Sequence, residues 1–243
     1  MEPALLTAAR LLEWRRRSQP GADAQYPPGV IVTHQPSVFR ALAPRFRSRA
    51  LAGLTTPARA IERGRIAIAL PAIGAPTTAM LVDELAVRGV RRIVSVDLCA
   101  SISPEVPTGA VVLVQAACCG DGTSSHYAPG RDVVEPDGAL VETLRVALTS
   151  AGIACVNGRV WSTDAPYRET PSLLQRARDA GAVGIDMETC ALFAAGAAAG
   201  VSCAAVLVTA DRLLDAWQPP SDMGAVNAML RRVAGVALVV LRS

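Results

Sequence analysis

The fold of this chain is decided by the stretch Gly184-Ile185-Asp186-Met187-Glu188-Thr189-Cys190-Ala191-Leu192-Phe193. It begins as the end of a short apolar strand and continues as a helix of small residues that is predicted to stop near Gly200. A second apolar run, 203–208, follows and leads to Asp211. This order predicts strand, helix and strand, with an acidic residue after each strand. Because ligands of open parallel sheets bind at the carboxyl ends of strands, Glu188 and Asp211 are candidate site residues.

Both acids also have a structural interpretation. Glu188 would begin a helix that otherwise carries almost no charge, and a carboxylate in the first turn of a helix complements the helix dipole. Asp211 is followed by Arg212, and the two side chains can form an ion pair. From the residues alone these alternatives stay open.

The rest of the chain alternates predicted strands (29–33, 65–70, 92–96, 109–116 and 155–162) with predicted helices (77–88, 136–151, 170–180 and 223–241). Such alternation predicts an α/β fold: a single domain with a central mixed, mostly parallel sheet flanked by helices. Residues 1–28 are predicted to be an N-terminal extension, made of a helix and a linker rich in Pro and Gly. Residues 29–243 are predicted to be the α/β domain.

The composition limits the classes of partner. The 243 residues are 51% hydrophobic and 19% charged, which suits one α/β domain with a large core. The net charge is only +3, and aromatic residues make up only 4%, so we expect no nucleic-acid partner. No apolar run reaches the length of about 18 residues that a membrane span needs, and the N-terminus has no signal pattern. We therefore expect a cytoplasmic protein without a membrane partner.

The residues also argue against metal and organic cofactors. The six cysteines form no CxxC pair and the chain has only two histidines, so we expect no metal site. No glycine-rich fingerprint of a dinucleotide or P-loop site occurs, and we expect no organic cofactor. Several cysteines lie in apolar runs, where Cys acts as a small hydrophobic residue, and this is typical of a reducing compartment.

Four segments resemble the purine-nucleoside and uridine phosphorylase family in the right order. The opening stretch with 208–213 is similar to the Met-Glu segment and acid-ended strand of that family. Earlier in the chain, 74–76 with 83–85 is similar to its small-residue turn and the helix that follows. The segment 121–129 is similar to its uridine-type loop, and 158–167 to its base-pocket segment. The resemblance extends from about Gly29 to the C-terminus and implies a nucleoside phosphorylase-like fold and activity.

The resemblance assigns roles to these residues. It implies that Met187 packs under a ribose, that Glu188 holds a ribose hydroxyl and that Asp211 faces the base. Glu188 and Asp211 are therefore the candidate catalytic residues. The other candidate substrate-binding residues are Gly74, His126, Asp164, Tyr167 and Arg168. Tyr167 is alternatively a core aromatic residue, and Arg168 is alternatively a solvated arginine.

The chemistry of these groups suits cleavage of an N-glycosidic bond. In the transition state of that reaction the ribose becomes cationic and the leaving base anionic. The charge of Glu188 favours a positive sugar, and Met187 offers it a polarizable apolar surface. Asp211 is able to donate or share a proton with the base if burial raises its pKa.

The positions that hold phosphate in the family differ here. The family places a glycine and an arginine after the first strand, where this chain has His34 and Val38. It ends the strand at 92–96 with an arginine, a glycine and a hydroxyl residue, and the aligned residues here are Ser95, Asp97 and Leu98. Asp97 adds a negative charge where an anion would bind. The candidate phosphate-binding residues are therefore Ser95, Arg40, and Arg49 from a neighbouring subunit.

Three classes of function stay open at this point. Phosphorolysis is the default of the family, and inorganic phosphate is then the co-substrate. Hydrolysis by water follows if the altered positions bind no phosphate. The third class is a non-catalytic nucleoside-binding relative or a different transfer reaction. The base is open as well, because the loop 121–129 favours uridine-type relatives whereas Asp211 favours purines.

The N-terminal helix generates a prediction about assembly. Its leucines and Trp14 need a partner surface, and the resemblance implies a homo-oligomer, a dimer, trimer or hexamer, with sites near subunit contacts. We expect light scattering at micromolar concentration to give a dimer or a larger species. A strict monomer under those conditions would contradict this prediction.

Overall fold

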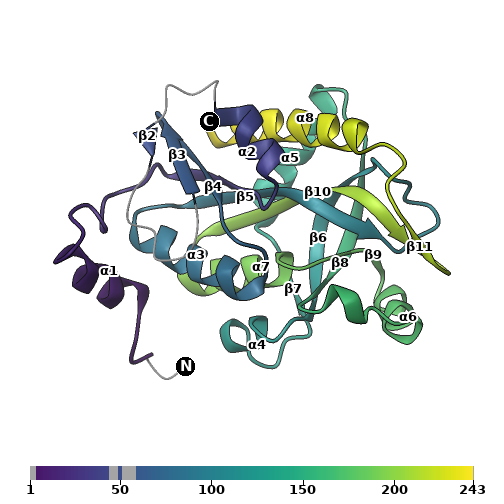
Figure 1. The fold of residues 1–243 in the computed structure, drawn as a ribbon, viewed down its shortest axis with the longest axis horizontal. Coiled ribbons are helices and arrows are strands. Elements are labelled where there is room, and N and C mark those ends of the chain that lie inside the picture. The colour runs from purple at the N-terminus through teal and green to yellow at the C-terminus, as the bar shows by residue number, and fades with distance from the viewer. Residues whose placement is uncertain (1–3, 44–48, 51–58, 243) are drawn as a thin grey trace.

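The computed structural model describes residues 4–43, 49–50 and 59–242. The helices are α1 (Ala8–Arg16), α2 (Pro36–Leu42), α3 (Ala75–Val87), α4 (Ser124–Tyr127), α5 (Gly138–Ser150), the 3-10 helix η2 (Pro166–Arg168), α6 (Pro171–Asp179), α7 (Thr189–Ala199) and α8 (Met223–Arg242). The strands are β1 (Gly29–Val32), β2 (Arg49–Ala50), β3 (Arg59–Arg63), β4 (Ile66–Leu70), β5 (Arg92–Ser101), β6 (Val111–Gly120), β7 (Val133–Val134), β8 (Cys155–Thr163), β9 (Ala182–Asp186), β10 (Ser202–Leu213) and β11 (Trp217–Gln218). The predicted α/β fold is confirmed (Figure 1).

The strands form one mixed sheet. Its order is β11-β10-β6-β8-β9-β5-β1-β4-β3-β2, with β7 paired to β6. The long pairings of β10 with β5 and of β6 with β8 are parallel, as are those of β1 with β4 and β5. Antiparallel pairings occur at β2, β3, β7 and β11, and where β6 and β9 join β10 and β5.

Part of this sheet closes on itself. Strand β5 pairs with β9 and also with β10, so the path from β10 through β6, β8 and β9 returns to β5 and then to β10. Strand β5 also pairs with β1, which shares one edge of β5 with β9. The remaining strands extend from this ring as an open sheet.

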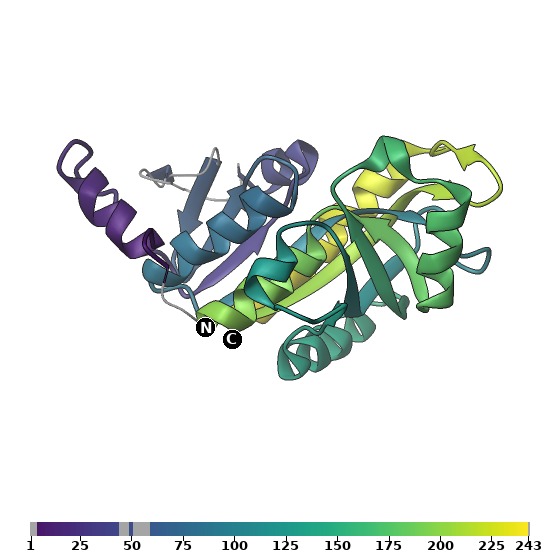
Figure 2. The same cartoon turned by 90° about the horizontal axis from the view of Figure 1, so that it is seen from below.

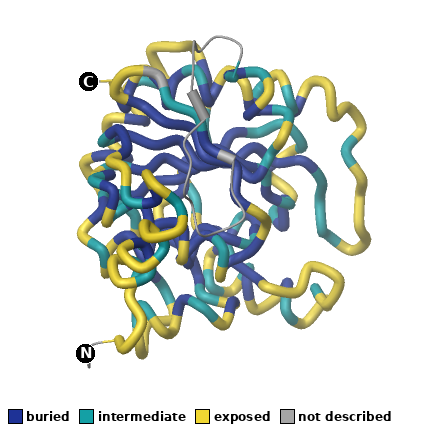
Figure 3. Tube along the Cα trace, turned by 60° about the vertical axis from the view of Figure 1, so that its left-hand side comes forward, coloured by how far each residue is buried: buried dark blue, intermediate teal, exposed yellow. Residues whose placement is uncertain are grey.

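Helices cover both faces of the sheet because successive strand residues point to opposite faces. Val30 and Val32 of β1 pack in one core with residues of α3 and α7, whereas Ile31 packs in a second core with residues of α2, α5 and α8. Figures 1 and 2 show these two helical layers on either side of the strands. Figure 3 shows that the most continuously buried segments are the central strands.

Helix ends follow the expected capping chemistry. Thr170 caps α6 by accepting a hydrogen bond from the main-chain N–H of Leu173, and Pro171 occupies the first turn. Gly200 ends α7 with a φ of 69°, in the left-handed region that favours glycine. Helix α8 has the length and apolar composition of a membrane span, yet it packs on β10, β5 and β1 and forms part of the second core.

The structure corrects three local predictions. Strand β10 continues past Asp211 to Leu213 because its last residues pair with β11, so Asp211 lies within the strand. No helix was predicted between the strands at 29–33 and 65–70, but α2 forms there. The placement of the cysteines was typical of a reducing compartment, where disulfides are rare, but Cys119 and Cys190 form a disulfide. Cys119 lies at the end of β6 and Cys190 at the start of α7. Their Cα atoms are 5.6 Å apart, within the range that a disulfide spans.

The predicted N-terminal helix forms, and α1 packs against α3 with Leu12 buried. Leu5 and Trp14 stay exposed, at 91% and 62% of their surface. The assembly prediction was made from such side chains. It stays a prediction, which light scattering tests.

Two helical glycines form a matched pair for a test of packing. A Cβ on Gly196 of α7 would lie 2.5 Å from Cys203 Sγ and 3.0 Å from the Val201 carbonyl oxygen, whereas a Cβ on Gly235 of α8 would meet nothing within 4 Å. We expect Gly196→Ala to lower the free energy of unfolding by about 1–3 kcal/mol. Gly235→Ala should raise it by about 0.5–1 kcal/mol, because alanine is the better helix former. Urea denaturation measures both, and equal effects would contradict the assigned packing of α7 on β10.

Candidate functional site

A cavity of about 630 Å³ lies where β5 changes neighbours. Ser95 of β5 still pairs with Val32 of β1, but Ala100 pairs with Ile185 of β9. The segment of β5 between these two positions opens towards the residues that follow β1 and β9. A change of strand neighbour of this kind is where α/β sheets bind ligands. The lining residues are His34, Gln35, Ile73, Asp97, Leu98, Cys99, Ala100, Pro166, Tyr167, Glu169, Ile185, Asp186, Met187, Glu188, Ala210, Asp211, Leu213 and Trp217.

Glu188 lies buried in the wall of this cavity. The main-chain N–H of Gly74 donates to Glu188 Oε1 at 2.8 Å, and the main-chain N–H of Met187 donates to Oε2 at 3.3 Å. Gly74 has a φ of 113°, which a residue with a Cβ rarely adopts, so this bond depends on glycine. Burial raises the pKa of Glu188 to about 7, although the nearby imidazole of His34 acts in the opposite direction.

Asp186 precedes Glu188 and has a structural role. Its carboxylate accepts hydrogen bonds from Ser162 Oγ at 2.6 Å, from the main-chain N–H of Thr189 at 2.9 Å and from Thr189 Oγ1. Ser162 Oγ in turn accepts the main-chain N–H of Cys190 at 2.9 Å. These bonds fix the first turn of α7, and with it the position of Glu188. Burial raises the pKa of Asp186 as well.

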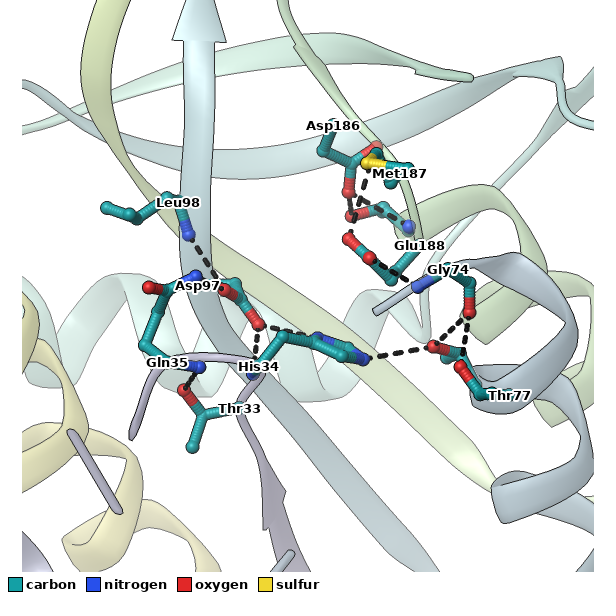
Figure 4. A network of polar contacts seen from close by, with 12 residues as sticks. Thr33, His34, Gln35, Gly74, Thr77, Asp97, Leu98, Asp186, Met187 and Glu188 are labelled. Atoms are coloured by element: carbon teal, nitrogen blue, oxygen red, sulfur yellow. Dashed lines mark hydrogen bonds and ion pairs between the residues drawn. The ribbon is translucent and has the colours of Figure 1, made fainter. Parts of the chain in front are cut away.

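His34 and Asp97 form a buried ion pair beside these acids (Figure 4). His34 Nδ1 lies 2.7 Å from Asp97 Oδ2, and His34 Nε2 lies 3.1 Å from Thr78 Oγ1. The Thr78 hydroxyl also lies 3.1 Å from the Gly74 carbonyl oxygen. An ionised carboxylate only accepts hydrogen bonds, so Nδ1 carries a proton, and the negative charge of Asp97 favours a second proton on Nε2. Burial by itself would lower the pKa of His34, but the Asp97 carboxylate outweighs burial and the pKa is raised.

A second group of residues that line the cavity comes from β10 and from η2 and its neighbours. A bulge between Thr209 and Asp211 interrupts the pairing of β10 with β5. Bulges of this kind re-aim side chains, and both Ala210 and Asp211 line the cavity. Trp217 Nε1 donates to Asp211 Oδ2 at 2.7 Å. Arg212, the alternative partner of Asp211, instead donates to the Pro104 carbonyl at 3.1 Å.

Two further residues lie at the rim on this side. Tyr167 is 99% exposed, so it is not a core aromatic residue. Burial raises the pKa of Glu169 to about 7, and the charge of Asp211 adds to the rise. Sequence reasoning missed Glu169 and Trp217. Each lies a few residues beyond a segment that carries the family resemblance, and only the folded chain brings them to the cavity.

The structure places the predicted site residues in three groups. Met187, Glu188, Tyr167 and Asp211 line the cavity, and Gly74 contacts it through Glu188. Asp164 accepts the main-chain N–H of Gly122, and His126 and Arg168 are exposed residues of α4 and η2 that are not among those lining the cavity. Among the predicted phosphate-binding residues, Ser95 is buried within β5, Arg40 is exposed on α2, and the side chain of Arg49 lies outside the described part of the chain.

The charges that line the cavity are mostly negative. Asp97, Glu169, Asp186, Glu188 and Asp211 are acidic, and no arginine lines the described part of the cavity. The chain contains no lysine at all. His34 is therefore the side chain among the described lining residues that is able to carry a positive charge. Over the described ranges the structure has no group of three or more His, Cys, Asp or Glu residues arranged to hold a metal ion.

The cavity and the sheet together define an α/β protein with a cavity at a strand-neighbour switch, and comparison with known proteins gives its family. The model of the phosphorylase superfamily matches residues 40–242. The chain therefore belongs to the phosphorylase superfamily, which confirms the resemblance found in the sequence.

Individual relatives agree with this membership. The chain is 26% identical over 160 residues to the DeoD-type purine nucleoside phosphorylase of Bacillus thuringiensis (strain Al Hakam), covering 65% of this chain and 68% of the relative. Its fold is similar to that of an AMP nucleosidase from Bacteroides thetaiotaomicron VPI-5482, with a TM-score of 0.78 and 20% identity over 97% of this chain and 98% of the other. A uridine phosphorylase from Vibrio fischeri ES114 gives a TM-score of 0.78 and 23% identity over 92% and 97%.

The raised pKa of Glu188 generates a prediction about stability. The folded chain holds a proton on Glu188 up to a pH of about 7, whereas the unfolded chain releases it near 4.5, so this group's contribution to stability falls as the pH rises through that window. We expect Glu188→Gln to flatten part of the decline in the free energy of unfolding between pH about 5 and about 7. Glu169 contributes to the same decline, and Glu169→Gln should remove a similar share because the pKa of Glu169 is raised to about the same value.

The control is Glu142→Gln, at an exposed glutamate that pairs with Arg145. Hydrogen bonds from Arg145 lower the pKa of Glu142. Glu142→Gln should therefore leave the decline in the free energy of unfolding with rising pH in place. Denaturant unfolding at a series of pH values measures all three variants. Parallel profiles for the wild-type protein and Glu188→Gln would contradict the assigned pKa.

Proposed function

We propose that this chain cleaves the N-glycosidic bond of a nucleoside, with water as the nucleophile. The observation that carries the proposal is the arrangement of acids around one cavity. Glu188 and Met187 line it at the start of α7, and Asp211 and Glu169 line it from β10 and from the residue after η2. The reaction needs two such groups, because the sugar becomes cationic while the base leaves as an anion.

The ribose binds beside Met187 and Glu188 in this proposal. The two Glu188 oxygens are oriented by main-chain N–H groups, so the carboxylate is held in place before substrate arrives. Preorganised charge of this kind stabilises a transition state without reorganisation during the reaction. Because the pKa of Glu188 is about 7, a ribose hydroxyl and a developing positive charge favour its ionised form when substrate binds.

The base binds on the side of Asp211 and Glu169. Trp217 holds one oxygen of Asp211, and the other is free to face a ring nitrogen. Glu169 has a pKa of about 7, so it carries a proton in a large fraction of molecules near neutral pH. Glu169 supplies the proton that neutralises the leaving base, and Asp211 accepts a hydrogen bond from the protonated ring nitrogen. We propose a purine base, because protonation of a ring nitrogen assists a purine more than a pyrimidine.

We prefer water to phosphate as the nucleophile because the described lining of the cavity has few groups that are able to carry a positive charge. Doubly charged phosphate is normally bound by fixed arginines and main-chain or hydroxyl donors. The described lining of the cavity has His34 alone, and Asp97 already neutralises it. One of the solved structures with this fold is named an AMP nucleosidase, so by name the fold is not confined to phosphorylases. Phosphorolysis is the second candidate, favoured by the curated purine nucleoside phosphorylase relatives.

The test is release of free base from inosine, adenosine, guanosine, uridine and 5′-modified analogues, measured with and without added phosphate. We expect release from purine nucleosides at a rate that added phosphate leaves unchanged. Strict dependence on phosphate would overturn the choice of water. Absence of release from every nucleoside, with binding retained, would overturn the proposed cleavage and favour a non-catalytic binding protein.

Two variants test the assigned roles. Glu188→Gln should lower kcat/KM roughly 10²–10³-fold, because a charge that stabilises the transition state is lost. Asp211→Asn should slow purine nucleosides by roughly 10²-fold or more and pyrimidine nucleosides little. The control is Asp164→Asn, which alters an exposed acid outside the cavity lining. Equal losses for Asp164→Asn and Glu188→Gln would contradict the assignment.

A further inference from the structure

The carboxylate of Asp97 fills a set of donors at the floor of the cavity. Its Oδ2 accepts the main-chain N–H and the imidazole Nδ1 of His34, both at 2.7 Å. Its Oδ1 accepts Gln35 Nε2 at 2.9 Å and the main-chain N–H of Leu98 at 3.1 Å. Figure 4 shows these four donors converging on one side chain. A carboxylate has about four acceptor positions, so Asp97 is saturated.

These donors are the kind that bind a free anion. Two are main-chain N–H groups, that of His34 just after β1 and that of Leu98 within the neighbouring strand β5. The others are the side-chain amide of Gln35 and the buried ring nitrogen Nδ1 of His34. Main-chain N–H groups and polar side-chain donors that converge on one point make an anion-binding concavity. His34, Gln35, Asp97 and Leu98 all line the same cavity as Glu188, so the concavity opens towards the proposed substrate.

The rest of the network fixes these donors in place. His34 is buried and held on its far side by Thr78, whose hydroxyl bonds to the Gly74 carbonyl. The main-chain N–H of the same Gly74 bonds to Glu188. The donors around Asp97 and the carboxylate of Glu188 are therefore parts of one hydrogen-bonded unit.

We propose that Asp97 is a tethered anion that occupies a built anion-binding subsite and thereby excludes phosphate from the floor of the cavity. Asp97 is then the residue that determines the nucleophile, since a cavity without bound phosphate leaves water to attack. This consequence for the reaction rests on the proposed function, whereas the occupied subsite stands on the hydrogen bonds alone.

The test removes the tethered carboxylate and supplies a free one. In Asp97→Ala the four donors lose their acceptor, and formate, the nearest free analogue of the lost group, should take its place. We expect formate and inorganic phosphate each to bind Asp97→Ala at least about tenfold more tightly than the wild-type protein, and to raise its thermal midpoint accordingly. Calorimetric titration with each anion, against chloride at equal ionic strength, measures the change.

Two variants serve as controls. Asp97→Asn keeps the size of the side chain, so it should leave the subsite filled and bind neither anion. Asp137→Ala removes a carboxylate that accepts hydrogen bonds from Leu140 and Ser202, away from the cavity. It should lose stability without gaining anion binding. If Asp97→Ala binds formate and phosphate no better than Asp137→Ala, the proposal is overturned.

The wild-type protein gives a second measurement should Asp97→Ala fail to fold. The chain has only two histidines, so the ring nitrogens of His34 and His126 are separable by NMR. We expect Nδ1 of His34 to stay protonated at neutral pH, and the signals of both ring nitrogens to be unaffected by millimolar phosphate. Phosphate-induced shifts at His34 would overturn the proposal. Anion binding is measured without substrate, so failure of the proposed cleavage is a separate result, namely the absence of base release from any nucleoside.

Discussion

A strand has two edges, and β5 uses one of them for two partners. It pairs first with β1 and then with β9, while β10 occupies the other edge. No strand can fill the space between the two partners, and the cavity lies there. The loop after β1, the start of α3 and the start of α7 all meet at this opening, so residues far apart in the chain share one site. The ring of five strands that the second pairing closes holds these segments in register.

The opening contains more buried charge than a core usually tolerates. An uncompensated buried carboxylate is costly, and such groups are kept only where hydrogen bonds or opposite charges compensate them. In this protein each of three buried carboxylates is compensated in a different way. Hydrogen bonds hold Asp186 at the start of α7, His34 donates two hydrogen bonds to Asp97, and Glu188 has two main-chain donors and a pKa of about 7. Glu188 is therefore the acid in this wall whose charge responds most readily to a ligand.

The sequence was sufficient for the fold class and for one wall of the site. Alternating apolar runs and caps such as Thr170 are local signals, and the segment around Met187 and Glu188 is contiguous. The protonation of His34 could not be predicted, because it depends on Asp97 and Thr78, which are 63 and 44 residues away. The roles of Glu169 and Trp217 both involve Asp211, which lies at the bulge of β10. Trp217 also lies in the short hairpin of β10 and β11. The Cys119–Cys190 disulfide likewise needed the folded distance between β6 and α7.

We propose that in this member of the phosphorylase superfamily the buried pair of His34 and Asp97 takes the place of bound phosphate. The chemical identity of the sugar formed when a cleaved nucleoside is turned over in excess phosphate tests this proposal. ³¹P NMR and mass spectrometry of the reaction mixture distinguish a sugar 1-phosphate from the free sugar. We expect the free sugar alone. A sugar 1-phosphate as the main product of the wild-type protein would contradict it.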